Sequence, residues 1–309
     1  MHVADQRDGS SPGHGAMEDT PLMRELTRDH ARRKQLEGLQ FTVPDHTRII
    51  TVANQKGGVG KTSTTVNVAA ALAMGGLNVL VIDADPQGNT STALGIEHHA
   101  EVPSMYEVLV EGAELSEVIQ AVPEMERLYC APATINLSGA EIELVSLVAR
   151  ENRMRNAIRD LLEQREAAGA PRLDYVIVDC PPSLGLLTIN ALVAAREVLI
   201  PIQAEYYALE GLSMLLNNID LIRQHLNPDL VVSTIMLTMY DARTRLAAQV
   251  AQDVRDHFPE QTLETTIPRS VRISEAPSYG QTVLTYDPSS SGALAYRAAA
   301  YELNTRPAP

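Results

Sequence analysis

The sequence lacks any apolar run near the roughly 20 residues that a membrane-spanning helix needs. Its first residues also lack the apolar stretch of a secretory signal, so we expect no export signal and no membrane span. Only two cysteines occur among 309 residues, Cys130 and Cys180, and they lie far apart in apolar contexts. This usage predicts a reduced, cytoplasmic protein. The patterns HExxH, CxxC and GxSxG are absent, which argues against the metalloprotease, thiol-redox and serine-hydrolase classes that they mark.

Positive charge is scarce, since 25 Lys and Arg residues face 39 Asp and Glu residues and give a formal net charge of −14. This balance argues against a generally basic nucleic-acid binder but leaves room for a local basic patch. The hydrophobic share of 45% and the charged share of 21% describe a globular protein with ample material for a core. At this length we expect one large domain, or a domain with an appendage.

Short apolar runs alternate with helical patterns from residue 48 onward. The predicted strands are residues 49–53, 79–82, 128–130, 175–178, 198–202, 230–237 and about 265–267. The predicted helices include residues 62–74, 137–164, 185–195, 209–226 and 245–258. Continuous β-branched runs suit strands that are buried on both faces, and alternation with helices indicates right-handed crossovers. The expected fold class is α/β, a mainly parallel twisted sheet with helices on both faces.

Residues 1–47 differ from the rest in composition and are predicted to be a flexible N-terminal extension of a domain that spans residues 48–309. Thr20 as a cap and Pro21 at the first helical position predict a helix over about residues 20–38. Arginines recur there at intervals of four and would share one face: Arg24, Arg28 and Arg32. The extension is either a solvated, partly helical tail or a basic arm that touches nucleic acid or a partner protein.

A glycine-rich stretch, QKGGVGKTSTT at residues 55–65, separates the first predicted strand from an alanine-rich helix. Strand, glycine turn and helix N-terminus in this order form a phosphate cradle, because successive backbone N–H groups and the positive helix end point at one spot. We expect Lys61 to reach the β- and γ-phosphates of a nucleotide and the Thr62 hydroxyl to ligate Mg²⁺. The predicted nucleotide-binding residues of this stretch are Lys56, Gly57, Gly58, Val59, Gly60, Lys61, Thr62 and Ser63.

The cradle departs from the standard pattern G-x-x-x-x-G-K-[ST], because Gln55 stands where the first glycine would fall. An additional lysine, Lys56, lies at the loop entrance. One bound triphosphate already has Lys61 and a metal ion to satisfy it. Lys56 is therefore spare within one subunit, which suggests a partner for it in another.

Two later predicted strands end in acidic residues, at the edge of the sheet where α/β proteins bind ligands. The segment IDADPQGN provides Asp83 and Asp85, which either serve the metal's water shell and the attacking water or form a helix cap and turn. The segment YVIVDCPPS has the form of a Walker B strand, whose acid, Asp179, contacts Mg²⁺ directly or through water. Cys180 has no positioned base beside it and is predicted to be a packed core residue.

Six motifs in order resemble the ParA/Soj family of DNA-partitioning ATPases, which belong to the deviant Walker A class of P-loop proteins. They are KGGVGKT at 56–62, DADPQGN at 83–89, LSGAEIEL at 137–144, DYVIVDCPPSLG at 174–185, LTMYDART at 237–244 and IPRSVRISEAPSYG at 267–280. The resemblance covers about residues 48–303. Ser63 replaces a threonine common in the family and keeps the hydroxyl, and Ser270 replaces a frequent asparagine.

The resemblance implies a catalytic set of Lys56, Lys61, Asp85 and Asp179 and a metal set of Thr62, Asp85 and Asp179. In an ATP-dependent homodimer Lys56 would cross to the phosphates of the other subunit. Asp85 would position the hydrolytic water, and Asp179 would hold the metal shell and sense the γ-phosphate. The cofactors implied are ATP and Mg²⁺, with Met239 and Pro268 in the adenine pocket.

The resemblance further implies that Arg243 and Arg272 contact DNA without sequence preference. The expected function is a slow ATPase for chromosome or plasmid partition, which binds nucleoid DNA as an ATP dimer and leaves it when a ParB-type partner stimulates hydrolysis. A membrane-associated positioning ATPase of the MinD type is an alternative. Residues 294–303 argue against it, because they are weakly apolar and have no basic face. A nucleotide-gated scaffold for polar or cell-division proteins is a second alternative.

Overall fold

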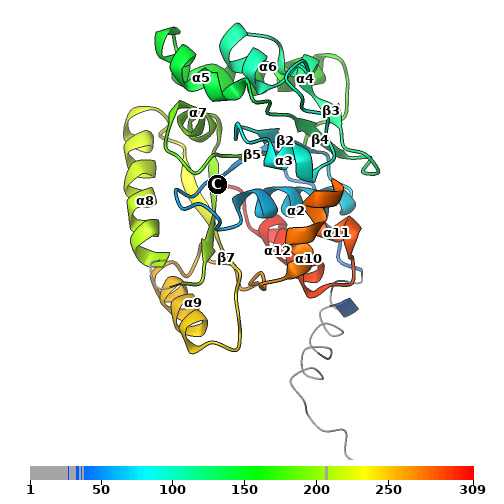
Figure 1. The fold of residues 1–309 in the computed structure, drawn as a ribbon, viewed down its shortest axis with the longest axis vertical. Helices are drawn as coiled ribbons and strands as arrows, with labels where there is room; N and C mark the ends of the chain where they lie inside the picture. The colour runs from blue at the N-terminus through cyan, green and yellow to red at the C-terminus, as the bar shows by residue number, and fades with distance from the viewer. Residues whose placement is uncertain (1–26, 28–32, 35, 37, 206–207) are drawn as a thin grey trace, which may run out of the picture.

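The computed structural model describes residues 27, 33–34, 36, 38–205 and 208–309. A seven-stranded sheet lies at its centre, in the order β3-β4-β2-β5-β1-β6-β7 (Figure 1). Neighbouring strands are parallel except for β3 and β4, which are antiparallel at one edge. The strands are β1 (Arg48–Val52), β2 (Val79–Asp83), β3 (Gln120–Ala121), β4 (Leu128–Ala131), β5 (Tyr175–Asp179), β6 (Glu197–Gln203) and β7 (Val231–Thr238). The predicted α/β class is confirmed.

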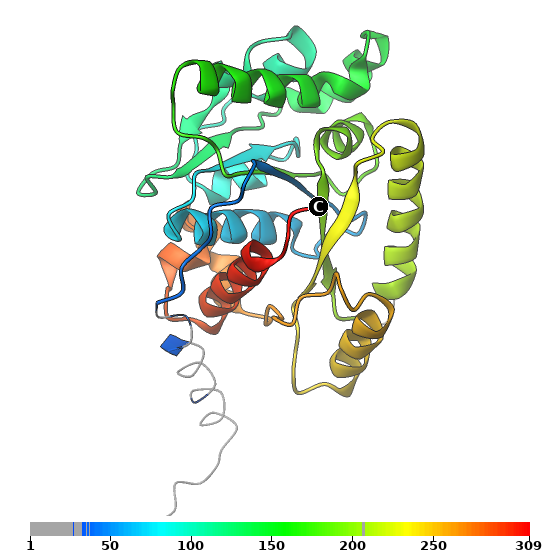
Figure 2. The same cartoon turned by 180° about the vertical axis from the view of Figure 1, so that it is seen from behind.

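Helices cover both faces of this sheet (Figures 1 and 2). The α-helices are α2 (Lys61–Met74), α3 (Asn89–Ala93), α4 (Leu115–Val118), α5 (Leu137–Glu143), α6 (Arg153–Ala167), α7 (Leu186–Ala194), α8 (Ala208–His225), α9 (Arg245–His257), α10 (Val271–Glu275), α11 (Val283–Tyr286) and α12 (Ser291–Thr305). The remaining helical segments are the π-helix η1 (Glu107–Glu111) and the 3₁₀ helices η2 (Leu144–Ser146), η3 (Arg150–Asn152) and η4 (Ala276–Tyr279). In the described part of the chain, no helix is both long and apolar enough to cross a membrane.

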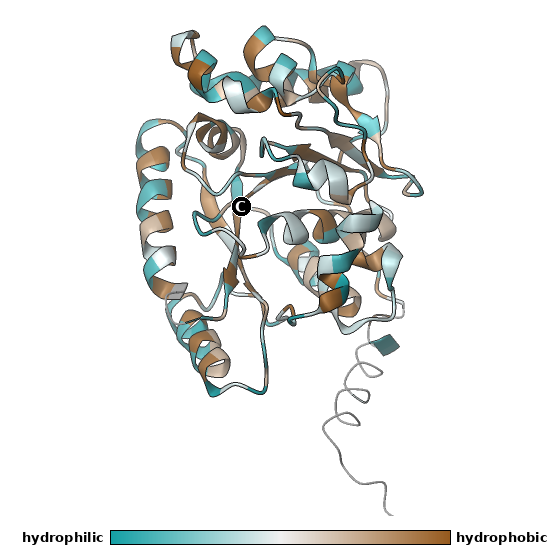
Figure 3. Ribbon diagram, viewed as in Figure 1, coloured by the Kyte–Doolittle hydropathy of each residue, from teal (hydrophilic) through white to brown (hydrophobic). Residues whose placement is uncertain are grey.

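Alternate strand residues enter different layers of the core. In β2, Val79 and Val81 pack in the cluster of α2 and α12, whereas Leu80 and Ile82 pack in the cluster of α4 to α7. A third cluster joins β6 and β7 to α7, α8 and α9. Every residue of β2 and of β5 is buried, as expected for parallel strands covered on both faces. Figure 3 shows hydrophobic strands inside and helices of mixed hydropathy outside.

Helix α2 is the central helix of its layer, and α12 packs against it. Its alanine-rich sequence, KTSTTVNVAAALAM, is buried on nearly all sides, which is typical of an interior helix. Residues 294–303, weakly apolar in the sequence, form the centre of α12, and Leu294, Tyr296 and Leu303 are buried there. The helix that follows the glycine-rich stretch is therefore held firmly between the sheet and α12.

The strand expected at about residues 265–267 does not form. Ile267 donates its N–H to the carbonyl of Leu237 at 2.8 Å, and only an isolated bridge joins Tyr240 to Pro268. The N–H of Arg269 donates to the carbonyl of Tyr240 at 3.3 Å, so the pairing passes Pro268 but does not become a continuous ladder. The segment lies beside the end of β7 as an irregular connection.

The helix expected over residues 137–164 is interrupted. The chain is extended at Leu147 and left-handed at Ala149, with a φ of 52°, between α5 and α6. The Asn190 side chain in α7 donates to the carbonyl of Arg150 at 2.8 Å and accepts from the N–H of Met154 at 3.2 Å. A neighbouring helix thus holds the break in place, which local periodicity could not reveal.

Described residues that precede β1 in the chain contact α12. Arg33 and Lys34 are helical and exposed, whereas the predicted basic face of Arg24, Arg28 and Arg32 lies outside the described residues. Phe41 meets the ring of Tyr301 edge-on at 5.6 Å, and the N–H of Thr42 donates to the Asn304 side chain at 2.8 Å. The domain boundary at residue 47 stays a prediction, with these contacts preceding it in the chain.

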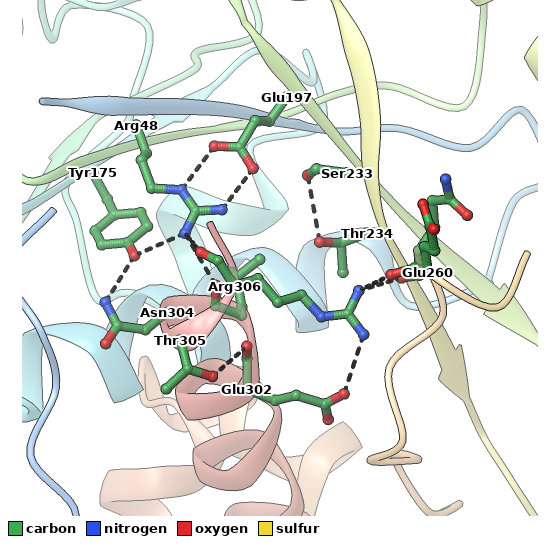
Figure 4. A network of polar contacts seen from close by, with 12 residues as sticks. Arg48, Tyr175, Glu197, Ser233, Thr234, Glu260, Glu302, Asn304, Thr305 and Arg306 are labelled. Carbon is green, nitrogen blue, oxygen red and sulfur yellow. Dashed lines mark hydrogen bonds and ion pairs between the residues drawn. The ribbon is translucent and has the colours of Figure 1, made fainter. Parts of the chain in front are cut away.

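A buried polar network lies where β1, β5 and β6 begin (Figure 4). Arg48 binds Glu197 through two hydrogen bonds of 2.7 and 2.6 Å, and both side chains are 2% exposed. The guanidinium also donates to the carbonyl of Leu303 at 3.0 Å and lies over the ring of Tyr175. Asn304 completes the network with a hydrogen bond of 2.9 Å to the Tyr175 hydroxyl. This network ties the C-terminal end of α12 to the edge of the sheet opposite the loops described next.

Candidate nucleotide site

Three central strands, β1, β5 and β2, end side by side. Strand register places Val52 beside Asp179, and Asp179 beside Asp83. The glycine-rich stretch follows β1, so the three predicted loops meet at the carboxyl edge of the sheet. This is the position at which parallel α/β sheets bind their ligands.

The glycine-rich stretch forms an open cradle at the N-terminus of α2. Gly58 and Gly60 have φ values of 74° and 88°, in the left-handed region that favours glycine. A Cβ atom at Gly57 or Gly58 would meet nothing within 4 Å, so the outer side of the loop is open to a ligand. The Thr238 hydroxyl donates to the carbonyl of Val59 at 2.8 Å and fixes the inner side. The N-terminal N–H groups of α2 and its positive dipole end suit an anion here.

Lys61 is the first residue of α2 and is 7% exposed. Its ammonium donates to the carbonyl of Lys56 at 3.4 Å. Burial lowers the pKa of Lys61, and the nearby charges of Asp179 and Asp85 oppose that shift. The structure therefore brings the predicted phosphate-binding lysine and both predicted acids into one electrostatic neighbourhood.

Asp179 is fully buried at the end of β5 and accepts hydrogen bonds from three threonines. Thr90 donates at 2.7 Å, Thr62 at 2.8 Å and Thr65 at 3.2 Å. Burial raises the pKa of Asp179 to about 6, against the lowering effect of the hydroxyls of Thr90 and Thr62. This cluster consists of carboxylate and hydroxyl oxygens, which are the hard donors that Mg²⁺ prefers. Thr62 and Asp179, two of the three predicted metal ligands, thus fit a magnesium ion and lie in contact.

Asp83 and Asp85 flank the turn after β2 in different surroundings. Asp83 is fully buried and accepts from the N–H and hydroxyl of Ser91 at 2.9 and 2.7 Å. Burial raises the pKa of Asp83 to about 7, and the charge of Asp179 adds to the shift. Asp85 is 7% exposed and accepts from the N–H of Gln87 at 3.0 Å. Both carboxylates thus accept backbone N–H groups of the turn, and Asp85 is the more exposed of the two.

Lys56 lies on the exposed side of the cradle, in a different environment from Lys61. Its N–H donates to the side chain of Asn54 at 3.0 Å, and its ammonium pairs with Glu205 at 2.9 Å. The side chains of Lys56 and Glu205 are 49% and 47% exposed. Glu205, which follows β6, thus holds Lys56 at the mouth of the site.

The two segments predicted to enclose adenine lie together. Tyr240 donates its N–H to the carbonyl of Ile267 at 2.9 Å and bridges to Pro268, which places the LTMYD and IPRS segments side by side. Met239 has a φ of 50°, an unusual value for a side-chain-bearing residue, at the turn just after β7. The Thr238 contact described above connects these segments to the cradle.

Arg243 and Arg272 stand on the surface next to acidic side chains. Arg243, in the loop after β7, contacts Asp241 at 2.8 Å and keeps the pKa of that carboxyl low, at about 2. Arg272, in α10, contacts Glu275 at 3.0 Å and Asp287 at 3.4 Å. Their predicted DNA contacts stay a prediction, and any phosphate would have to replace these carboxylates.

Several residues of the site were missed in the sequence. Thr65 follows Lys61 by four residues and so lies on the same helix face, a spacing that could have pointed to it. Thr90 and Ser91 follow the DADPQGN motif directly, but nothing local predicts that they reach Asp179 and Asp83. Glu205 is brought to Lys56 only by the fold. Cys130 and Cys180 are free and buried as predicted, and burial raises the pKa of each thiol well above its ordinary value.

Comparison with known proteins identifies close relatives over most of the chain. A family model described as an AAA domain matches residues 47–232. The sporulation initiation inhibitor protein Soj of Bacillus subtilis is 50% identical over 249 residues, which cover 81% of this chain and 95% of that protein. The chromosome partitioning protein ParA of Myxococcus xanthus is 48% identical over 262 residues, which cover 85% and 89%.

Solved structures share the fold and carry nucleotides. The crystal structure described as cobyrinic acid a,c-diamide synthase from Mycobacterium smegmatis, with bound ATP analog and magnesium, has a TM-score of 0.69 and 37% identity over 82% of this chain and 93% of that one. The septum site-determining protein MinD of Pyrococcus horikoshii, complexed with Mg-ADP, has a TM-score of 0.66 and 26% identity over 84% and 96%. With the family model matching more than half of its length and relatives sharing about half of their residues, the chain belongs to the ParA/Soj family of chromosome-partitioning ATPases.

Proposed function

We propose that this chain is a slow, partner-stimulated ATPase that segregates a chromosome or plasmid and that acts as an ATP-bound dimer. The position of Lys56 carries the proposal. Lys61 is the buried lysine of its own subunit's cradle, whereas Lys56 is half exposed at the mouth of the site. A second ammonium in this place is available to the phosphates of a nucleotide bound by another subunit.

The pairing of Lys56 with Glu205 does not oppose this role. An exposed ion pair of this kind contributes only about 0–1 kcal/mol. A charge-assisted hydrogen bond to a phosphate is stronger, particularly in a closed interface that excludes water. Lys56 would therefore leave Glu205 when two nucleotide-bound subunits meet face to face.

The acids and hydroxyls of the site supply the remaining parts of the reaction. When bound, Mg²⁺ would supply positive charge that offsets the charge of the phosphates. Thr62 and Asp179 would hold the ion, with Asp85 in its water shell. Asp85 would also orient the attacking water, and the threonines around Asp179 keep that carboxylate in place for sensing the γ-phosphate.

Arg243 and Arg272 are the proposed contacts to double-stranded DNA, which place the dimer on the nucleoid. Their neighbours Asp241, Glu275 and Asp287 hold each guanidinium at the surface. Exchange of these carboxylates for DNA phosphates would make binding depend strongly on salt, with a log–log slope of roughly −0.9 per phosphate neutralised. Hydrolysis stimulated by a ParB-type centromere-binding partner would then release the dimer from DNA.

The test compares Lys56→Ala with Glu205→Gln by sedimentation velocity in ADP, in ATP and in a non-hydrolysable ATP analogue. Lys56→Ala should bind ATP but stay monomeric, and should lose nucleotide-dependent DNA retention. Glu205→Gln removes the same ion pair but keeps the ammonium, so it should still dimerise. Normal dimerisation and turnover in Lys56→Ala would refute the shared site.

The alternatives predict different outcomes in two further assays. Helix α12 has its apolar residues buried against α2, so it has no free apolar face for a membrane surface. Sedimentation with liposomes should therefore leave the ATP-bound protein in the supernatant, whereas a positioning ATPase at a membrane would pellet. A nucleotide-gated scaffold would show the same low ATPase rate with and without DNA and a ParB-type partner.

A further inference from the structure

We infer that Asp83 is a positioning residue for ATP hydrolysis, because its carboxylate holds both ends of the turn that carries Asp85. The inference rests on the proposed role of Asp85 in orienting water. Asp83 is the last residue of β2 and is 0% exposed. It therefore acts from beneath the turn, as part of the sheet.

Both oxygens of Asp83 are used. Oδ1 accepts the backbone N–H of Asp85 at 3.2 Å, and Oδ2 accepts the N–H and hydroxyl of Ser91 at 2.9 and 2.7 Å. These donors lie two and eight residues further along the chain. One carboxylate at the end of a strand thus fastens the turn at its start and where α3 begins.

Hydrogen bonds within the turn give it its shape but do not attach it to the sheet. The N–H of Gly88 donates to the carbonyl of Asp85 at 2.9 Å, and the N–H of Gln87 donates to the Asp85 carboxylate at 3.0 Å. The sheet contacts of this segment come from Asp83, from the N–H of Ala84, which donates to the carbonyl of Asp179 at 3.0 Å, and from the Thr90 hydroxyl, which donates to the Asp179 carboxylate at 2.7 Å. Without the Asp83 carboxylate, the turn would keep its shape but lose the three hydrogen bonds that this carboxylate accepts.

Helix α3 connects this anchorage to the proposed metal ligand. Adjacent residues of α3 bind acids on adjacent strands, since Thr90 donates to Asp179 at 2.7 Å and Ser91 to Asp83. The Ser91 hydroxyl also accepts the N–H of Ala133 at 3.2 Å, beyond the end of β4. The placement of Asp85 relative to Asp179 thus depends on a framework in which Asp83 is the central acceptor.

A second buried carboxylate beside Asp179 is costly, because both groups are desolvated and their charges repel. A positioning role accounts for this cost in folding free energy, because a displacement of about 1 Å of a catalytic group can lower a rate by about 100-fold. Asp83→Asn keeps the size of the side chain but replaces one acceptor oxygen with a donor. It should loosen one of the two ends of the turn.

The experiment measures partner-free ATPase rates, with ATP and Mg²⁺, for Asp83→Asn, Asp85→Ala and the double variant. Asp83→Asn should lower kcat by about tenfold or more and change KM for ATP by less than about twofold. In the Asp85→Ala background the same substitution should lower kcat no further, because residues that act as one unit are not additive. An equal further loss in that background, or an unchanged kcat in Asp83→Asn alone, would overturn the inference.

Asp174→Asn is the matched control. Asp174 is also a buried aspartate that accepts a backbone N–H, from Asn78 at 2.8 Å, but it precedes β5 at the opposite edge of the sheet from Asp179. It should lower the unfolding temperature and leave kcat unchanged. An equal loss of kcat in Asp174→Asn would mean that general destabilisation, not positioning, explains the effect.

One outcome separates this inference from the proposed function. Normal turnover in Asp85→Ala alone refutes the role of Asp85, whatever Asp83→Asn does. If Asp83→Asn does not fold, Ser91→Ala removes one of its three donors and should still lower kcat with KM preserved. Wild-type kcat in a folded Ser91→Ala variant would then overturn the positioning role.

Discussion

Replacing Glu197 with leucine should destabilise the protein strongly without touching the nucleotide site. The substitution leaves the Arg48 guanidinium, 2% exposed, without the carboxylate that receives two of its hydrogen bonds. What remains to it are the carbonyls of Leu303 and Arg306, at 3.0 and 3.3 Å, and the Tyr175 hydroxyl at 3.4 Å (Figure 4). Breaking a buried pair from one side costs about 3–5 kcal/mol, because an uncompensated charge stays in the core.

Denaturation in urea measures this cost directly, with the slope of the transition checked for constancy. Arg48→Met combined with Glu197→Leu removes both charges and should cost less than Glu197→Leu alone. Asp220→Leu is the surface control: it breaks a pair with Arg223 whose side chains are 59% and 50% exposed, and should cost less than about 1 kcal/mol. A Glu197→Leu variant no less stable than this control, or a double variant no more stable than Glu197→Leu alone, would refute the reasoning.

The ATP affinity of Glu197→Leu should stay close to that of the wild type. The pair lies at the beginning of β1 and β6, and the cradle follows the other end of β1. Five residues of strand at about 3.3 Å each separate the two by roughly 16 Å. Isothermal titration with ATP and Mg²⁺, below the unfolding temperature of the variant, makes the comparison.

Further predictions concern charge in and around the site. Lys61→Ala should abolish ATP binding, because it removes the buried ammonium of the cradle, and near-normal affinity by titration would contradict the site. The nucleotide-free protein should lose stability as the pH rises from about 4 to 7, since burial raises the pKa of Asp83 to about 7 and of Asp179 to about 6, so the folded state binds more protons there than the unfolded state. In Asp83→Asn the free energy of unfolding should depend less steeply on pH across this range. An unchanged pH dependence would argue against the raised pKa of Asp83. Arg243→Glu combined with Arg272→Glu should abolish DNA binding at two salt concentrations while ATP binding persists; unchanged retention would place the DNA surface elsewhere.

The sequence could predict the cradle because its signal is local. Glycines at Gly57, Gly58 and Gly60, followed at once by Lys61, need only a strand before them and a helix after them to form a phosphate site. Asp179 was predictable for a similar reason, since an acid at the end of a continuous apolar run belongs to the carboxyl edge of a parallel sheet. The same alternation of apolar runs and helices determined the α/β class.

Other features depended on contacts between distant parts of the chain. The break at Ala149 is held by Asn190 from another helix, and the segment around Pro268 lies beside the end of β7 through an isolated bridge, although local patterns favour a helix and a strand there. Thr90 and Thr65 converge on Asp179 only after β2, β5 and α2 have packed together.

Lys56, the lysine that marks the deviant Walker A class, shows the same difference between what the sequence and what the tertiary structure determines. Its presence beside the cradle, and its surplus within one subunit, are properties of the sequence. Its position at the open mouth, paired with Glu205 rather than buried beside Lys61, was decided by the tertiary structure, because β6 brings that carboxylate from 149 residues away. Spacing along the chain determines which groups a loop contains, whereas the packing of strands and helices decides which of them face each other and which face solvent.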